Sequence, residues 1–162
     1  GGSNVAFFKQ LTAAGITGKN QTVLSLAVSE EEVSGIGADN TVDTLTCMGY
    51  FQSLKNPAND RFVKAFKAKY GANRVVGDTL ECGYNSVYLW KLAAEKAKSF
   101  DVEKVVAASS NLEIDAPEGK VKFHQSNHHL WKHARIGRFR KDGQVDMLFE
   151  SPLIEPNPFP KL

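Results

Sequence analysis

The sequence predicts an α/β fold whose C-terminal third is antiparallel. Two stretches rich in apolar and β-branched residues, 22–28 and 41–46, are typical of buried strands. They alternate with segments whose apolar residues recur at helical spacing. From residue 120 onwards, alternating stretches separated by turn residues indicate antiparallel strands instead. We therefore expect a parallel sheet flanked by helices, with antiparallel strands at the C-terminus.

The composition is that of a soluble globular protein. Of the 162 residues, 42% are hydrophobic and 23% are charged, close to the averages of such proteins. The formal net charge of +2 is too small and too evenly spread to indicate a nucleic-acid partner. No apolar run approaches the ~18 residues that a membrane span requires. These observations exclude nucleic-acid binding, a transmembrane anchor and intrinsic disorder.

The first elements carry clear local signals. Apolar residues at helical spacing predict a helix over 4–14, with Ser3 or Asn4 as its N-cap. After the strand at 22–28, Ser29 is followed three residues later by Glu32, which is a capping box. The three consecutive glutamates suit the first turn of a helix, where the helix dipole favours negative charge.

Three further helices follow in the middle of the chain. Phe62, Phe66 and Tyr70 share one face of a helix over 58–70, and Gly71 ends it. The segment 78–98 is apolar almost all round up to Leu92, which predicts a helix buried on most sides. Asp101 caps a last helix over 102–109.

The C-terminal third consists of strands and an extended tail. Alternation over 120–124 and 130–140 predicts two strands, and the Asp-Gly turn at 142–143 leads into a returning strand at 145–149. The tail, 151–162, holds four of the six prolines and is expected to be extended and irregular.

No group of residues indicates a metal site or a bound cofactor. The four histidines are concentrated at His124, His128, His129 and His133, but no metal-binding motif accompanies them, so we interpret them as polar turn and surface residues. Cys47 and Cys82 are interpreted as two small, partly buried thiols, although one bridge would be possible in an exported protein.

Catalysis is not indicated either. Ser29 lies at a strand-to-helix turn, but its neighbours are glutamates, and negative charge beside an alkoxide is unfavourable. The pair Gly35 and Gly37 lacks the lysine or third glycine of a phosphate-binding loop. We therefore predict that the chain is not an enzyme.

A second interpretation of the capping residues is ligand binding. In open α/β folds, ligands bind outside the carboxyl ends of the strands. Ser3, Asn4, Ser29 and Glu30 would lie there, and their hydroxyl, amide and carboxylate groups suit a small neutral polar ligand.

Motifs along nearly the whole chain form an ordered series. They are NVAFFKQL at 4–11, SLAVSEEEV at 25–33, YF at 50–51, NPAN at 56–59, ECGY at 81–84, DAPEG at 115–119, NHH at 127–129, RIG at 135–137, DGQ at 142–144 and PNPFP at 156–160. In this order and spacing, the chain resembles the C-terminal part of the urea and short-chain-amide substrate-binding proteins of ABC transporters. These are type I periplasmic binding proteins, and the amide-sensing negative regulator of amidase operons is a close relative.

The resemblance implies a division of the chain between two lobes. Family members are more than twice this length and hold their ligand between two α/β lobes joined by three crossing strands. On this basis residues 1–46 form part of the C-terminal lobe, 47–111 form part of the N-terminal lobe, and 112–162 form the C-terminal strands and tail. The exposed edges that this division implies predict a homo-oligomer, or pairing with the missing half.

The resemblance also implies the function and the contact residues. The chain would capture urea or a short amide for an ABC transporter permease, as a periplasmic protein or an exported lipoprotein. The expected ligand contacts are Ser3, Asn4, Ser29, Glu30, Tyr50, Glu81 and Tyr84. Two positions depart from the family: Gly49 replaces a polar side chain, and Cys82 replaces alanine. The alternatives are a cytoplasmic amide-sensing regulator and an amide hydrolase using Glu81 or the histidines.

Overall fold

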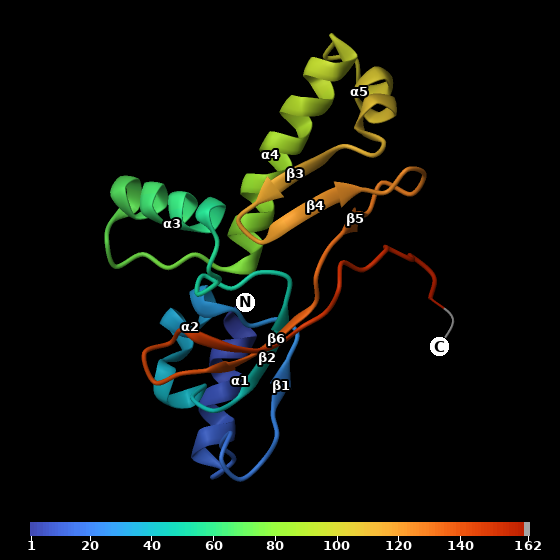
Figure 1. The fold of residues 1–162 in the computed structure, drawn as a ribbon. Helices are drawn as coiled ribbons and strands as arrows, with labels where there is room; N and C mark the ends of the chain where they lie inside the picture. Colours follow the sequence, from blue (N-terminus) through green and yellow to red (C-terminus); the bar gives the residue numbers. More distant parts are fainter. Residues whose placement is uncertain (161–162) are drawn as a thin grey trace.

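The computed structural model describes residues 1–160, which form two bodies stacked end to end (Figure 1). The lower body contains helices α1 (Gly2–Ala13) and α2 (Glu30–Ile36), the short 3-10 helix η1 (Ala38–Asn40), and strands β1 (Leu24–Ser25), β2 (Leu45–Met48), β6 (Arg135–Phe139) and β7 (Val145–Glu150). The upper body contains helices α3 (Pro57–Tyr70), α4 (Asp78–Ala97) and α5 (Val102–Ser109) and strands β3 (Glu113–Ala116), β4 (Gly119–Phe123) and β5 (Leu130–Trp131).

Each body has its own sheet. In the lower body the strand order is β1-β2-β6-β7, in which β1 pairs with β2 in parallel and the other pairs are antiparallel. In the upper body, β3, β4 and β5 form an antiparallel sheet. The predicted α/β class with antiparallel C-terminal strands is confirmed. No helix among the described residues is long and apolar enough to cross a membrane.

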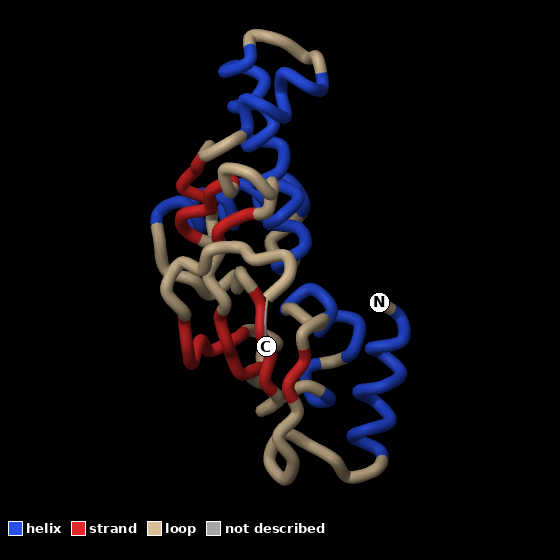
Figure 2. Tube along the Cα trace, turned by 90° about the vertical axis from the view of Figure 1, so that its right-hand side faces the viewer, coloured by secondary structure: helices blue, strands red, loops and turns tan. Residues whose placement is uncertain are grey.

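The chain passes between the bodies three times. The first pass is the segment 49–56 between β2 and α3, and the second joins β5 to β6. The third is the tail after β7, which runs beside the second through a bridge between Ile154 and Lys132. Figure 2 shows the same arrangement after a quarter turn. The residues expected to form one segment, 112–162, are thus shared: β3–β5 lie in the upper body and β6–β7 in the lower.

The helix caps predicted at Ser29 and Asp101 are formed, and the one predicted at Ser3 or Asn4 is not. The capping box of α2 is formed, with the Ser29 backbone N–H donating to Glu32 Oε2 over 2.7 Å. Asn56 caps α3 by accepting from the backbone N–H of Asn59 over 2.9 Å, and Asp101 caps α5 through the N–H of Lys104. The predicted cap of α1 is wrong, because that helix begins at Gly2 with Gly1 as its N-cap.

The two N-terminal strands differ from the prediction in length and position. The strand expected over 22–28 is only Leu24–Ser25, and it forms one edge of the lower sheet. The strand expected over 41–46 is shifted to Leu45–Met48, because η1 and the positive φ of Asp43 keep the preceding residues in a turn.

Helix α4 is buried on one side rather than on most sides. Leu89, Ala93 and Ala94 pack inward, whereas Tyr88 and Trp90 are about half exposed. Aromatic rings of α3 and α4 also contact each other in a row. It runs from the exposed Tyr88 and Tyr84 through the buried Phe62 and the half-buried Phe66 to the exposed Tyr70. The described residues therefore provide a packing layer for only one face of this helix.

The largest hydrophobic cluster joins the two bodies. Its members come from both bodies and from the first crossing: Phe8, Val28, Val33, Ile36, Tyr50, Phe51, Leu54, Phe62, Val76, Phe139 and Val145. Burial of this much apolar surface stabilises the junction by several kcal/mol, at about 25 cal/mol per Å². The junction is consequently an internal part of the fold.

Candidate functional site

The start of α2, the first crossing and the start of α4 meet at the junction. Gly77, which directly precedes α4, packs against Ser29, which directly precedes α2. A Cβ atom at Gly77 would lie only 2.3 Å from Ser29 Oγ, so the approach requires glycine. Because of this contact, the first residues of both helices face the same small region.

Glu30 is the buried carboxylate of this region, with 1% of its surface exposed. Its Oε1 accepts a hydrogen bond from the backbone N–H of Gln52 over 2.8 Å, whereas Oε2 has no partner. Burial raises the pKa of Glu30 to about 7, and the nearby carboxylates of Asp78 and Glu32 add to the increase. At neutral pH this group therefore exchanges between its acid and its ionised form.

Tyr50 braces the first crossing. Its backbone N–H donates to Asp78 Oδ1 over 2.8 Å, and its hydroxyl donates to Asn59 Oδ1 over 2.7 Å. Asn59 in turn donates to the carbonyl oxygens of Gln52 and Leu54. Burial, together with the charges of neighbouring carboxylates, raises the pKa of Tyr50 well above its usual value. The hydroxyl is thus neutral and already hydrogen-bonded within the fold.

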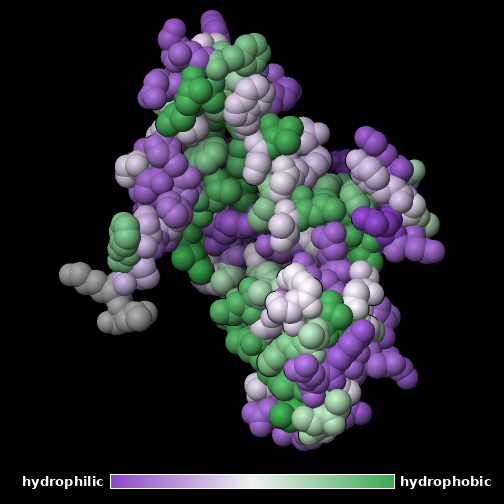
Figure 3. All heavy atoms as spheres, turned by 180° about the vertical axis from the view of Figure 1, so that it is seen from behind, coloured by the Kyte–Doolittle hydropathy of each residue, from purple (hydrophilic) through white to green (hydrophobic). Residues whose placement is uncertain are grey.

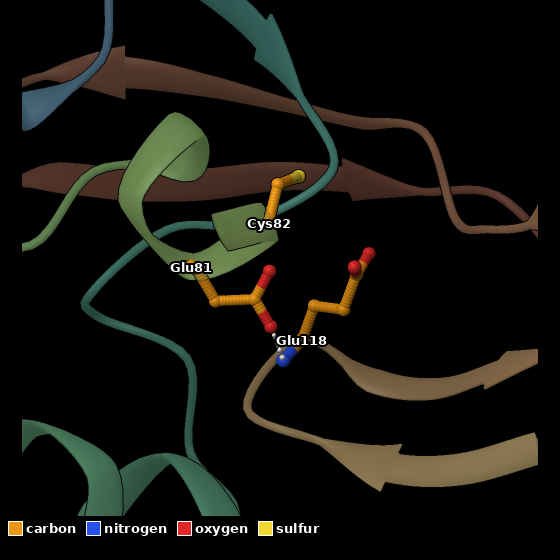
Figure 4. A group of neighbouring side chains, drawn as sticks. All are labelled: Glu81, Cys82 and Glu118. Carbon is orange, nitrogen blue, oxygen red and sulfur yellow. Dashed lines mark hydrogen bonds between the residues drawn. The ribbon is translucent and has the colours of Figure 1, made fainter. Parts of the chain in front are cut away.

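A second polar group lies at the first turns of α4, beside the turn between β3 and β4 (Figure 4). Glu81 Oε1 accepts from Asn85 Nδ2 over 2.7 Å and from the backbone N–H of Glu118 over 3.1 Å. The Glu118 carboxylate pairs with Lys132 Nζ at 3.0 Å. Burial raises the pKa of Glu81 to about 7, with a further contribution from the Glu118 charge. We call Glu81, Asn85, Glu118 and Lys132 the α4 cluster.

The predicted ligand contacts fall into three places. Ser29, Glu30 and Tyr50 lie together at the junction, and Asn4 reaches the same side of the lower body, because its Nδ2 donates to the Ala27 carbonyl over 3.2 Å. Ser3, one residue earlier on α1, is exposed. Glu81 belongs to the α4 cluster. Tyr84 lies in the exposed aromatic row, with its ring centroid 4.5 Å from that of Phe62.

Several polar residues of the junction are missing from the sequence-based prediction. Asp78 and Asn59 hold the first crossing, and Glu118, Lys132 and Asn85 complete the α4 cluster. The spacing of Glu81 and Asn85, four residues apart on an otherwise apolar helix, is the signal that would have identified this pair. The partners Glu118 and Lys132 come from distant segments and have no such signal.

The four histidines do not converge. His124 lies 3.2 Å from Glu155 and stacks on Trp131, and His133 Nδ1 contacts the Ser151 carbonyl at 2.7 Å. The His124 contact attaches the tail to the upper body, and the His133 contact attaches the tail to the second crossing. His128 and His129 border a surface hollow.

Among the described residues, two hollows border the junction and a third lies in the upper body. A polar groove of about 1120 Å³ separates α3 from β6 and β7, and a pocket of about 210 Å³ lies between Glu30 and the β6–β7 turn. A third hollow, of about 780 Å³, has a mainly hydrophobic lining from α4, α5 and the tail. Seen from behind, hydrophobic residues line this third hollow beside the tail (Figure 3).

The whole described chain matches one protein family. The family model described as "Periplasmic binding protein domain" matches residues 1–162. Among curated proteins, "Limonene hydroxylase" of Geobacillus stearothermophilus is 31% identical over 116 residues, which are 72% of this chain and 21% of that protein. Because the match covers only about a fifth of that protein, it does not transfer its activity.

Solved structures with the same fold include substrate-binding proteins of ABC transporters. An amino acid ABC transporter substrate-binding protein from Pseudomonas fluorescens Pf-5 has a TM-score of 0.83 at 19% identity, covering 97% of this chain and 43% of that one. A solute-binding protein from Rhodopseudomonas palustris BisB5, in complex with 3,4-dihydroxybenzoic acid, has a TM-score of 0.83 at 18% identity, covering 96% and 44%. A leucine-binding protein from Thermotoga maritima MSB8 has a TM-score of 0.73 at 21% identity, covering 90% and 41%. The chain thus spans about two fifths of these proteins.

Proposed function

The chain belongs to the periplasmic binding protein domain family, and we propose that it is the C-terminal part of a solute-binding protein that captures urea or a short-chain amide. The bound solute would be passed to the permease of an ABC transporter on the periplasmic side of the membrane. Residues 1–46 would belong to the C-terminal lobe and 47–111 to the N-terminal lobe. Residues 112–162 would be the C-terminal strands and tail that complete both lobes.

The observation that carries the amide proposal is the unpartnered oxygen of Glu30. Among the described residues, the buried side-chain atoms without a hydrogen-bond partner are all acceptors: Glu30 Oε2, Glu81 Oε2, Glu118 Oε2 and Asn85 Oδ1. A buried acceptor without a partner costs about 1–3 kcal/mol, and more when it is charged. A ligand that relieves this cost must donate hydrogen bonds, as the NH2 groups of urea and amides do.

The same observation disfavours an acidic ligand. Benzoate and its hydroxylated derivatives, present in some of the similar structures, carry a carboxylate. A ligand carboxylate beside those of Glu30 and Asp78 would be repelled by like charge in a low-dielectric region. For this reason we place the ligand contact at Glu30, with Ser29 and Asn4 beside it, and we assign Tyr50 a supporting role because its hydroxyl already binds Asn59.

Calorimetric titration of the chain with urea, acetamide and benzoate tests the proposal, with Glu30→Gln as the variant and Glu31→Gln as its matched control. A hydrogen bond to a charged group contributes about 1.5–3 kcal/mol, so Glu30→Gln should weaken amide binding roughly ten- to over a hundredfold. Glu31→Gln should leave the affinity unchanged. Binding of benzoate but not of amides would overturn the ligand class, and equal affinities in both variants would remove Glu30 from the site.

The alternative with the same fold is a cytoplasmic amide-sensing regulator, which would bind the same ligand without a permease. The two are distinguished by location: a protein found in the periplasmic fraction of cells supports transport. A protein confined to the cytoplasm supports the regulator.

A further inference from the structure

We propose that Glu81, Cys82 and Glu118 form a binding site for a thiophilic divalent cation of the zinc class, which replaces the ammonium group of Lys132. The site goes beyond the amide-binding proposal, since it lies in the α4 cluster rather than at Glu30. It also departs from the sequence-based expectation that the chain has no metal site.

The three side chains converge on one point. The ligand atoms of Glu81, Cys82 and Glu118 all lie within 4.8 Å of one another. Figure 4 shows the three side chains as neighbours, with Glu81 and Cys82 on α4 and Glu118 at the β3–β4 turn. Around a tetrahedral zinc ion with Zn–S and Zn–O bonds of about 2.3 and 2.0 Å, neighbouring ligand atoms lie about 3.5 Å apart. Side-chain movements of about an ångström would therefore bring the three ligand atoms to zinc-binding distances.

The two carboxylates have free acceptor atoms for such an ion. Glu81 and Glu118 are both at most 1% exposed, and the Oε2 atom of each has no hydrogen-bond partner. Asn85 holds the opposite oxygens, because its Nδ2 donates to Oε1 of Glu81 and, over 3.3 Å, to Oε1 of Glu118. Hydrogen bonds of this kind orient metal ligands and tune their affinity. The free oxygens are thus fixed in place before an ion arrives.

A cation already occupies part of this space. Lys132 Nζ lies 3.0 Å from Glu118 Oε1 and 3.2 Å from Cys82 Sγ. The Lys132 side chain is 26% exposed and borders the hydrophobic hollow between α4 and the tail, so its ammonium group can move out to solvent. The cluster therefore favours positive charge, and binding of a metal ion would require the Lys132 ammonium group to give up these two contacts.

The exchange conserves charge. At a pH where Glu81 and Glu118 are both ionised, the two carboxylates, the neutral Cys82 thiol and the Lys132 ammonium group sum to −1. With a divalent ion, the Cys82 S–H bond breaks, its proton goes to solvent, and a metal–sulfur bond forms. Lys132 leaves still protonated, and two carboxylates, a thiolate and a dication again sum to −1. No net buried charge is created, which avoids the large penalty of an uncompensated buried charge.

Cadmium titration of the 162-residue chain tests the site, because a cadmium–thiolate bond has an ultraviolet charge-transfer band. We expect a saturable band that zinc competes away, that Cys82→Ala abolishes and that Cys47→Ala preserves. Cys47 is the matched control, since it is the other half-buried free thiol. Circular dichroism of each variant establishes that it is folded.

Lys132→Met provides the sharper comparison. If the ammonium competes with the metal, its removal should tighten cadmium binding by at least about tenfold, because charges 3–4 Å apart interact by several kcal/mol near a protein surface. Glu81→Gln, which keeps the shape of the side chain, should weaken binding. The proposal is overturned if no saturable band forms, if the band survives Cys82→Ala, or if Lys132→Met weakens binding. Amide titration of Cys82→Ala and Lys132→Met is expected to be unchanged, which separates this site from the one at Glu30.

Discussion

Glu30→Gln should change the pH dependence of stability in a defined direction. The pKa of Glu30 is about 7 in the folded chain, because burial and nearby carboxylates disfavour the charged form, against 4.5 for the free side chain. Between these two values the folded state binds more protons than the unfolded state at this position. The free energy of unfolding therefore falls as pH rises from about 4.5 to 7, and the loss is complete above pH 7.

The size of the effect follows from the pKa difference. Each pKa unit corresponds to 1.36 kcal/mol, so ionised Glu30 destabilises the fold by about 3 kcal/mol at pH 8 relative to its protonated form. Glutamine resembles the protonated acid in shape and charge. We expect Glu30→Gln to match the parent chain near pH 5 and to exceed its stability by up to about 3 kcal/mol at pH 8.

Guanidinium chloride denaturation at pH 5, 6, 7 and 8, followed by circular dichroism, measures this difference. Urea is avoided because it is the proposed ligand. Glu31→Gln removes the same charge one residue further along α2 and is the matched charge control. If the curves of Glu30→Gln and the parent chain stay parallel from pH 5 to 8, Glu30 does not titrate in this range and the electrostatic reasoning fails.

Three further expectations concern the junction and the exposed surfaces. Gly77→Ala places a Cβ atom 2.3 Å from Ser29 Oγ and should cost about 1–3 kcal/mol in denaturation. Gly83→Ala, within α4 and with open space around it, should stabilise by up to about 1 kcal/mol. Tyr50→Phe leaves Asn59 Oδ1 without its donor and should cost about 1–3 kcal/mol in the same assay. Sedimentation at micromolar concentration should show association through the exposed aromatic row and the β1 edge, with more than ~2,000 Å² buried; a compact monomer at all concentrations would contradict this.

Features that depend on neighbouring residues were predictable from the sequence. The capping box of α2, the caps of α3 and α5 and the Asp-Gly turn before β7 involve residues at most four positions apart. Their geometry is set by hydrogen bonds to the nearest backbone groups, so no distant segment is needed to specify them.

Features that depend on distant segments were not predictable. The pattern of α4 indicates burial on most sides, but burial requires a second packing layer, and the described residues supply one only on the Leu89 side. Similarly, Glu81 was singled out through the family resemblance, whereas its partner Glu118 is 37 positions away and Lys132 is 51 away. A pairing of this kind follows from the fold rather than from any local pattern.

The buried acceptors of the junction connect the proposals physically. Each of the carboxylates at Glu30, Glu81 and Glu118 keeps one oxygen without a partner, and such a deficit is relieved by a proton, a cation or a ligand N–H group. At Glu118 the positive charge of the Lys132 ammonium group compensates the negative charge of the carboxylate. At Glu30 the remaining choices are a proton, favoured below pH 7, and an N–H donor. A hydrogen-bond donor favours the ionised carboxylate, so amide binding at Glu30 and protonation of Glu30 oppose each other. A ligand bound there would therefore lower the pKa of Glu30 and release its proton.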